Sequence, residues 1–220
     1  MFSQSRLTFL LVACALMTSV TGCQTVSLKR TTTQQQRDAL SHIVTQATEL
    51  QHWSIQGKMG IRTEETAHSI QLWWNQQGED FQLQLTGPFG AGSAKIEGSK
   101  AFLTLKTGKD TFLETTPEAL FQRLFGWQVP ISHVFWWVKG SPVPDIPVTQ
   151  VTWNEHHQLV SLSQAHWQVQ FSKYQPIDMT ETRKDSSSAS LHIKELPHKI
   201  TIEKEDKKLT ILIHAWEIFE

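Results

Sequence analysis

Hydrophobic and polar residues alternate along most of the chain after residue 52. In residues 81–86, for example, Phe81, Leu83 and Leu85 alternate with polar residues. A period of two is typical of a strand with one buried face. The pattern predicts about ten or eleven strands, at residues 53–61, 68–75, 80–86, 91–97, 101–106, 111–114, 148–153, 159–163, 165–172, 199–203 and 209–216. Short glycine-containing turns, such as Gln77-Gly78, separate several of them and favour antiparallel pairing.

Three segments have helical spacing instead. Apolar positions in residues 34–50 recur every three or four residues, as on one face of a helix. Thr116-Pro117-Glu118 is a helix start signal, because proline suits the first helical position, and it predicts a helix that ends at Gly126. A second short helix is expected at residues 132–139, before Gly140.

These elements predict a mainly β domain. A long antiparallel meander must close or nearly close to hide its edges. A barrel of more than about eight strands is too wide for side chains alone to fill, so it tends to enclose space for a ligand.

The first residues are expected to lie outside this domain. Arg6 precedes an apolar stretch, residues 7–20, which is too short to span a bilayer and is typical of a secretory signal. Val20-Thr21-Gly22-Cys23 resembles the lipobox of bacterial lipoproteins, which implies a lipid on Cys23. We therefore predict a signal peptide at 1–22, a lipidated N-terminus and tether at 23–33, and the domain at 34–220. Gln24 in place of aspartate implies sorting to the outer membrane.

The alternative is an ordinary signal peptide that leaves a free cysteine. Cys14 would leave with the signal, so Cys23 would be the sole cysteine of a protein that enters an oxidising compartment. This argues against the alternative, and it excludes a disulfide or a cysteine-based metal site in the mature chain.

Composition narrows the function further. The mature chain has 19 basic and 21 acidic side chains, so it lacks the basic surface that nucleic-acid binding requires. Nine tryptophans and eleven phenylalanines against one tyrosine provide apolar area with little hydrogen-bonding demand.

The sequence contains no recognisable motif for catalysis or for metal or nucleotide binding. The sequence has no nucleophile elbow, zinc-protease helix or phosphate-binding loop. The pair His156-His157 would point to opposite faces of a strand or lie in a turn, which disfavours a metal site. We expect neither enzymatic activity nor a cofactor.

The turn Gly87-Pro88-Phe89-Gly90-Ala91-Gly92 joins two predicted strands. Glycine and proline make it a turn by composition, and Phe89 is its only large side chain. The ring is either folded back onto the core or presented outward, and the hexapeptide by itself favours the first.

This turn and several other segments resemble the LolB family, the outer-membrane lipoprotein receptors of the lipoprotein-sorting pathway. Residues 126–131 (GWQVPI) and 137–142 (WVKGSP) are similar to the family signature G-x-x-[IV]-P…W-[IV]-x-G-x-P. The turn at 87–90 is similar to the family's protruding loop, although the usual leucine at its tip is Phe89 here. Leu196-Pro197 and the strands that end in Trp216 resemble its C-terminus.

The resemblance implies an incomplete antiparallel β-barrel with an N-terminal helix and a short helical lid over a hydrophobic cavity. It implies a lipid-anchored protein on the periplasmic face of the outer membrane of a Gram-negative bacterium. Such a protein accepts lipid-modified proteins from a soluble LolA-like carrier and releases them into the membrane phospholipid. The loop of Gly87, Pro88, Phe89 and Gly90 would contact the membrane, and we expect a monomer.

Inward alternation selects twelve candidates for the cavity that would shelter acyl chains. They are Trp53, Ile55, Trp74, Phe81, Leu83, Leu85, Phe102, Leu120, Leu124, Trp136, Trp137 and Trp167. A register error of one residue would exchange Trp73 for Trp74. Two other functions stay open, a structural envelope lipoprotein with a filled interior and an envelope hydrolase without a recognisable motif.

Overall fold

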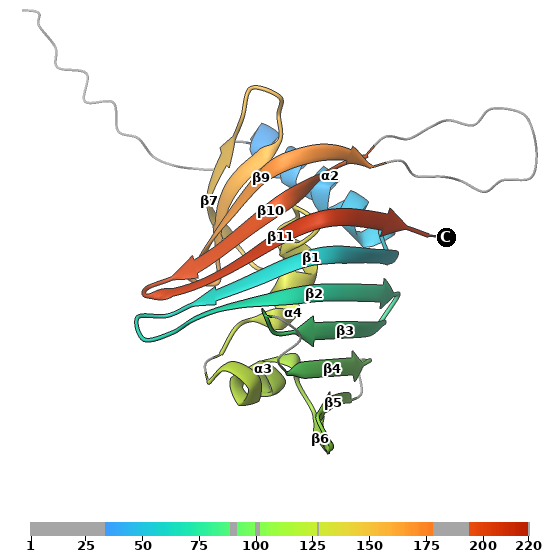
Figure 1. Ribbon diagram of the computed structural model, residues 1–220. Helices are drawn as coiled ribbons and strands as arrows, with labels where there is room; N and C mark the ends of the chain where they lie inside the picture. Colours follow the sequence, from blue (N-terminus) through green and yellow to red (C-terminus); the bar gives the residue numbers. More distant parts are fainter. Residues whose placement is uncertain (1–33, 89–91, 100–101, 127, 178–193, 220) are drawn as a thin grey trace, which may run out of the picture. The chain divides into compact units, whose positions relative to one another are not determined.

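The computed structural model describes residues 34–88, 92–99, 102–126, 128–177 and 194–219. The chain divides into two units, Met1–Thr31 and Thr32–Glu220, and every described residue belongs to the second. The described strands form one antiparallel sheet of eleven strands, in the order β6-β5-β4-β3-β2-β1-β11-β10-β9-β8-β7 (Figure 1). Because β6 and β7 are not paired with each other, the sheet is open, and the predicted incomplete barrel is confirmed.

The predicted elements are all present, and the largest differences are the end of β9 and the start of β10, each five residues from the predicted position. The helices are α2 (Gln34–Glu49), α3 (Pro117–Phe125) and α4 (Ile131–Trp137). The strands are β1 (His52–Arg62), β2 (Ala67–Gln77), β3 (Asp80–Thr86), β4 (Ser93–Gly98), β5 (Leu103–Thr107), β6 (Asp110–Glu114), β7 (Val148–Trp153), β8 (Leu159–Gln164), β9 (Trp167–Ile177), β10 (Lys194–Lys204) and β11 (Lys207–Ile218).

The prediction placed the start of one strand in the turn between β8 and β9. Residues 165–172 were expected to form one strand, but β9 begins at Trp167. Ala165 and His166 have φ angles of 52° and 65°, and they form a two-residue hairpin loop between the paired residues Gln164 and Trp167. Glycine and asparagine usually occupy such loops, so the composition of this turn did not reveal it.

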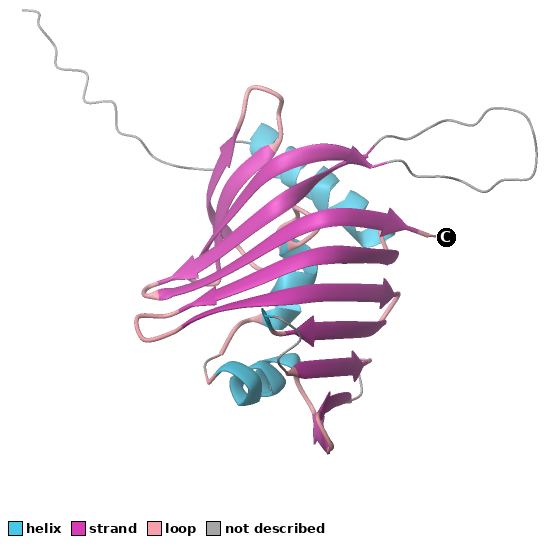
Figure 2. Cartoon of the chain, viewed as in Figure 1, coloured by secondary structure: helices cyan, strands magenta, loops and turns pink. Residues whose placement is uncertain are grey.

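One face of the sheet carries the core, and α2 and α4 lie behind the strands in the view of Figure 2. The start of α3 follows the predicted signal, because the Thr116 hydroxyl accepts a hydrogen bond from the Ala119 backbone N–H at 3.2 Å. Residues of α3 and α4 enclose a void of about 20 Å³ together with β1, β2, β3 and β11. We call α3 and α4 the lid helices, because this packing places them over the buried face of the sheet.

A bulge bends the centre of the sheet. The register of β1 against β11 shifts between Gln56 and Gly57. A Cβ atom on Gly57 would lie 2.1 Å from the carbonyl oxygen of Leu212, so the two backbones approach too closely there for any other residue.

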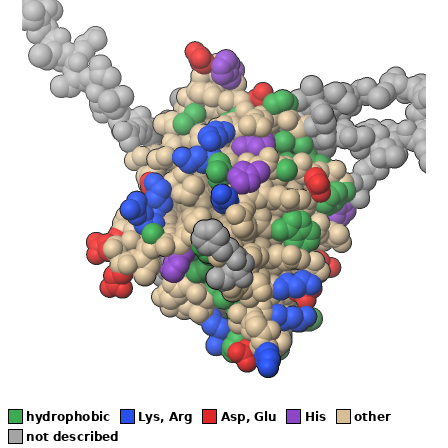
Figure 3. Space-filling view, in the orientation of Figure 1, with side chains coloured by type: hydrophobic (Ala, Val, Ile, Leu, Met, Phe, Trp, Pro, Cys, Tyr) green, Lys and Arg blue, Asp and Glu red, His purple; other side chains and the backbone are tan. Residues whose placement is uncertain are grey.

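The surface is polar over the face shown in Figure 3, where Lys and Arg are interspersed with Asp and Glu and hydrophobic side chains are scattered. Large hydrophobic residues that are exposed in the described part of the chain are Phe102, Leu113 and Phe219. Most other aromatic side chains of the described residues are buried or partly buried. Among the described helices, none combines the length and apolar character needed to cross a bilayer.

Candidate functional site

An open pocket of about 490 Å³ lies where the helices meet one end of the sheet. Its walls come from the end of α2, the start of β1, the β2–β3 turn and both lid helices. Lining residues from these elements include Leu50, Trp53, Gln76, Phe81, Leu103, Pro117, Phe135, Trp136 and Lys139. The pocket is therefore assembled from segments that are distant in the sequence.

Aromatic rings form its main wall. The Trp53 ring centroid lies 4.9 Å from that of Trp74 and 5.3 Å from that of Trp216. Phe135 of α4 meets Trp74 at 4.8 Å and Phe81 at 5.0 Å, both edge to face. Tilted and edge-on aromatic pairs at these distances are favourable, so the lid helix is held to the sheet by ring contacts.

Most of the twelve predicted cavity residues are inside the domain, in three groups. Trp53, Phe81 and Trp136 line the pocket, and Trp74 and Leu83 line the void beneath the lid helices. Ile55, Leu85, Leu120, Trp137 and Trp167 are buried in the core, and Leu124 is partly buried against it. Trp74 is buried and Trp73 is half-buried, so the predicted register of β2 is confirmed. That these side chains contact acyl chains stays a prediction.

The inward placement of Phe102 is wrong, because its side chain is 55% exposed. The strand β5 begins at Leu103, two residues later than predicted, and Leu103 and Leu105 are the inward residues. Gly98 makes room for them, since a Cβ atom there would lie 2.3 Å from the Leu103 side chain and 2.8 Å from Phe81. The alternation then directs Phe102 to the outer face.

Phe135 is a pocket-wall residue that sequence reasoning missed, and Trp216 packs against the wall residue Trp53 without lining the pocket. Phe135 lies in a run of five apolar residues, VFWWV. Because every position in this run is apolar, the pattern does not show which side chains face the pocket, and the adjacent Trp136-Trp137 pair was chosen instead. Phe135 lines both the pocket and the void.

Three polar contacts hold the lid helices in place. The Glu118 carboxylate accepts a hydrogen bond from the Ser132 backbone N–H at 2.9 Å, which joins α3 to α4. The Arg123 side chain pairs with Glu114 of β6 at 2.7 Å. The Lys139 ammonium donates to the Ala47 carbonyl of α2 at 2.5 Å and lies 4.6 Å from the centre of the Trp136 ring.

A buried glutamine anchors the chain that leaves α4. The Gln164 side-chain oxygen accepts hydrogen bonds from the Trp137 indole at 3.1 Å and the Val143 backbone N–H at 2.9 Å. Its amide nitrogen donates to the carbonyls of Val143 at 2.9 Å and Ile146 at 2.7 Å. One fully paired side chain therefore fixes the end of the lid and the connection to β7.

The signature segments that are far apart in the sequence meet beside this anchor. Gly140 has a φ of 73°, and a Cβ atom there would lie 3.2 Å from the Pro197 ring. The Trp216 indole donates to the Pro197 carbonyl at 3.4 Å. The motif residues thus form one packed region, which explains why glycine and proline stand at these positions.

The base of the loop 87–92 is closed by a hydrogen bond from the Gly87 N–H to the Gly92 carbonyl at 3.0 Å, and Pro88 is exposed. Phe89, Gly90 and Cys23 lie outside the described residues. Their predicted roles stay predictions.

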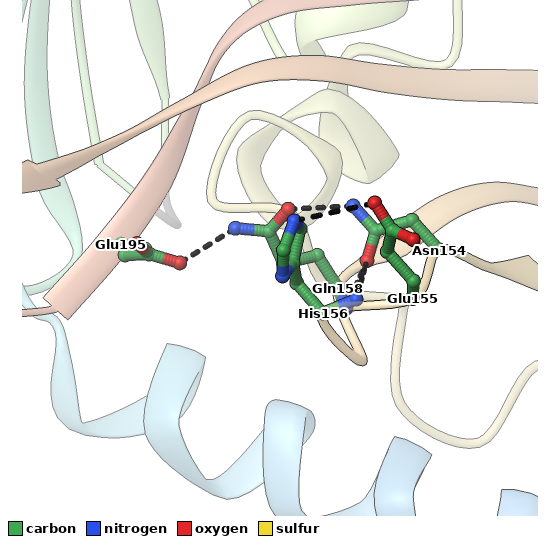
Figure 4. Close-up of polar contacts among 5 residues, drawn as sticks. All are labelled: Asn154, Glu155, His156, Gln158 and Glu195. Atoms are coloured by element: carbon green, nitrogen blue, oxygen red, sulfur yellow. Dashed lines mark hydrogen bonds and ion pairs between the residues drawn. The ribbon is translucent and has the colours of Figure 1, made fainter.

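A polar cluster at the β7–β8 turn contains the histidine pair considered for metal binding. Asn154 accepts hydrogen bonds from the backbone N–H groups of His156 and Gln158, and Gln158 donates to Glu195 of β10 at 2.5 Å (Figure 4). The His156 ring is exposed and lies 3.7 Å from Glu155. The cluster fastens a hairpin, and the described ranges contain no group of three or more His, Cys, Asp or Glu that could hold a metal ion.

His133 is a partly enclosed histidine on the lid helix α4. Its ring packs edge-on against Trp137 at 5.3 Å, and its Nδ1 atom is buried without a hydrogen-bond partner. Burial lowers the pKa of His133 below its usual value of 6.5, although the Glu118 charge opposes this shift. Below pH 6.5 the unfolded chain therefore binds a proton that the folded lid resists.

We expect the melting temperature to fall as the pH is lowered from about 7 to 5, through the usual pKa of histidine. His133→Gln removes this proton uptake, so the decrease should be smaller in that variant. Calorimetry at several pH values measures both. Equal pH dependence of the two proteins would show that His133 does not control the lid.

Comparisons with known proteins are consistent with this arrangement. The family model described as "Outer membrane lipoprotein LolB" matches residues 51–216, which span β1 to β11 up to Trp216. An outer-membrane lipoprotein LolB from Cellvibrio japonicus is 33% identical over 167 residues, 76% of this chain and 77% of the relative. That of Stutzerimonas stutzeri is 32% identical over 178 residues, 80% of this chain and 77% of the relative.

Structural similarity extends further than sequence similarity. A DUF1329 family protein from Desulfovibrio piger aligns with a TM-score of 0.51 and 8% identity, over 82% of this chain and 90% of that protein. This likeness concerns the fold alone. The family match and the relatives above 30% identity show that the chain belongs to the LolB family of outer-membrane lipoproteins.

Proposed function

We propose that this protein receives lipid-modified proteins from a soluble LolA-like carrier, shelters their acyl chains in the pocket beneath α4, and releases them into the outer membrane. As a member of the LolB family it is an outer-membrane lipoprotein receptor in lipoprotein localisation. The finer steps, the acyl site and the carrier, belong to the proposal. So do lipidation of Cys23, contact of Phe89 with phospholipid, and action as a monomer.

The aromatic pocket carries this proposal. Its volume of about 490 Å³ lies within the range of roughly 300–1,000 Å³ that is usual for ligand sites. Trp53, Phe81 and Phe135 provide the apolar contact that a hydrocarbon chain requires. A scaffold lipoprotein was expected to have a filled interior, so the open pocket favours a receptor. The LolB family is a non-enzymatic trafficking family, and we therefore do not propose a hydrolase.

Transfer can proceed without an energy source if each site along the route binds acyl chains more tightly than the previous one. Each methylene group that leaves water gains about 0.8 kcal/mol, so an acylated protein needs an apolar shelter in the periplasm. Ring faces shield a chain without fixing one geometry, which suits a site that must release its ligand. The void beyond Phe135 would extend the apolar path if that ring turned.

Thr48→Trp is expected to block the pocket. Thr48 is an exposed residue of α2 that lines the mouth, so a large ring there should occupy the space of a ligand. We expect the affinity for a fluorescent fatty acid to fall about tenfold or more, as judged by titration of the mature chain.

Thr45→Trp is the matched control. Both threonines are exposed on α2 and donate to the carbonyl four residues earlier, at 3.1 Å for Thr45 and 2.8 Å for Thr48, but Thr45 is not among the residues that line this pocket. Undiminished binding by a folded Thr48→Trp variant, or an equal loss in both variants, would contradict an acyl site in this pocket.

A further inference from the structure

The aromatic wall of the pocket contains one polar atom whose role the apolar contacts do not explain. Trp53 is 1% exposed and lines the pocket, yet its indole nitrogen is buried with no hydrogen-bond partner. A buried N–H that lacks a partner destabilises the folded state, so its presence in a binding wall calls for an acceptor.

Neighbouring tryptophans are satisfied within the domain. The Trp74 indole donates to the Gln76 side chain at 3.2 Å, and the Trp137 indole donates to Gln164 at 3.1 Å. The Trp216 indole, whose ring packs against Trp53, donates to the Pro197 carbonyl at 3.4 Å. Trp53 thus differs from these three tryptophans, because its indole N–H has no acceptor among the described residues and could donate to a ligand.

We infer that the Trp53 N–H donates a hydrogen bond to the carbonyl oxygen of a bound acyl ester. This inference rests on the proposed function, because it concerns the same pocket. Every acyl chain ends in a carbonyl at its point of attachment, and that oxygen is an uncharged acceptor suited to a lone donor. The donor would distinguish an acylated client from a plain hydrocarbon chain.

The position of Trp53 fits the head of such a chain. It is the second residue of β1 and adjoins the polar rim of the pocket, which includes Gln51 and Thr48. The apolar wall continues from it toward Phe135. An ester group could therefore lie at the polar rim while its methylene groups extend along the apolar rings. Because the nitrogen is buried, the carbonyl would reach it only as the entering chain separates the rings.

Two lipopeptides that differ only in this carbonyl test the inference. One carries two palmitoyl ester chains on the glyceryl group of its N-terminal cysteine, and the other carries two hexadecyl ether chains. Each competes with a fluorescent fatty acid for the mature chain with Cys23→Ala, which lacks the lipid anchor. We expect the wild-type pocket to bind the ester about tenfold more tightly than the ether.

Trp53→Phe should remove this preference while both lipopeptides still bind. Replacement of Trp53 by benzothienylalanine, which has sulfur in place of the N–H, should do the same with less change in shape. Trp216→Phe is the matched control, because it removes an indole that is already paired with Pro197 and does not line the pocket, and it should keep the ester preference.

The outcomes separate the inference from the proposed function. Equal binding of ester and ether by the wild-type pocket would assign the Trp53 N–H to bound water and overturn the inference, while the acyl site would stand. Preference retained in both Trp53 variants would also overturn it. Failure of both lipopeptides to bind would reject the acyl site and the inference with it.

Discussion

Gln164→Leu is expected to lower the free energy of unfolding by about 3–5 kcal/mol. Leucine has a similar size but cannot pair with the Trp137 indole, the Val143 amide group or the Ile146 carbonyl. Each buried polar group that loses its partner costs about 1–3 kcal/mol. The total is smaller than the sum over these groups, because water can partly reach the Val143 backbone. Chemical denaturation measures the change. The same substitution should weaken acyl binding, because it frees the end of α4.

Gln158→Leu provides the comparison for this prediction. Gln158 also joins two segments, since it contacts Asn154 and donates to Glu195 (Figure 4), but the hydrogen bond to Glu195 is exposed. Water can replace the lost hydrogen bonds, so we expect a loss below about 1 kcal/mol. If Gln164→Leu were no more destabilising than Gln158→Leu, Gln164 would not be the anchor of the lid.

Phe89→Glu is expected to reduce delivery of lipoproteins from this receptor to outer-membrane vesicles by about tenfold or more. On the proposed function, the Phe89 ring enters the bilayer surface as a client is released, and a carboxylate resists that environment. Loading from the carrier should continue, because it uses the pocket and not the loop. The melting temperature should change little. Transfer of a radiolabelled lipoprotein, first from carrier to receptor and then to vesicles, separates the two steps.

Two further substitutions at Phe89 decide between an outward and an inward ring. Phe89→Leu keeps an apolar tip and should preserve delivery, whereas Phe89→Ala should reduce it without lowering stability. A ring packed in the core would instead cost about 3–5 kcal/mol on truncation to alanine. A large fall in melting temperature for Phe89→Ala, or full delivery by a stable Phe89→Glu variant, would refute the membrane role.

Much of the sheet could be predicted because its information is local. Phe81, Leu83 and Leu85 alternate with polar residues, and all three are buried on one face as expected. The helix signal at Thr116-Pro117 was equally reliable, since capping depends on neighbouring residues. Prediction failed where packing overrode local pattern, as at Phe102, which the close contact of Gly98 with Leu103 leaves on the outer face.

The sequence by itself determined the mainly β fold class, about ten or eleven antiparallel strands, the two lid helices and the resemblance to the LolB family. These properties follow from the periodicity of side chains and from short motifs. The tertiary structure alone decided which side chains form the pocket. Phe135 reaches Trp74 and Phe81 only because α4 crosses the sheet, and Gln164 meets Trp137 only because β8 returns beneath the lid. The unpaired Trp53 N–H is likewise a property of its neighbours in space, since the absence of a hydrogen-bond partner depends on contacts that no local pattern encodes.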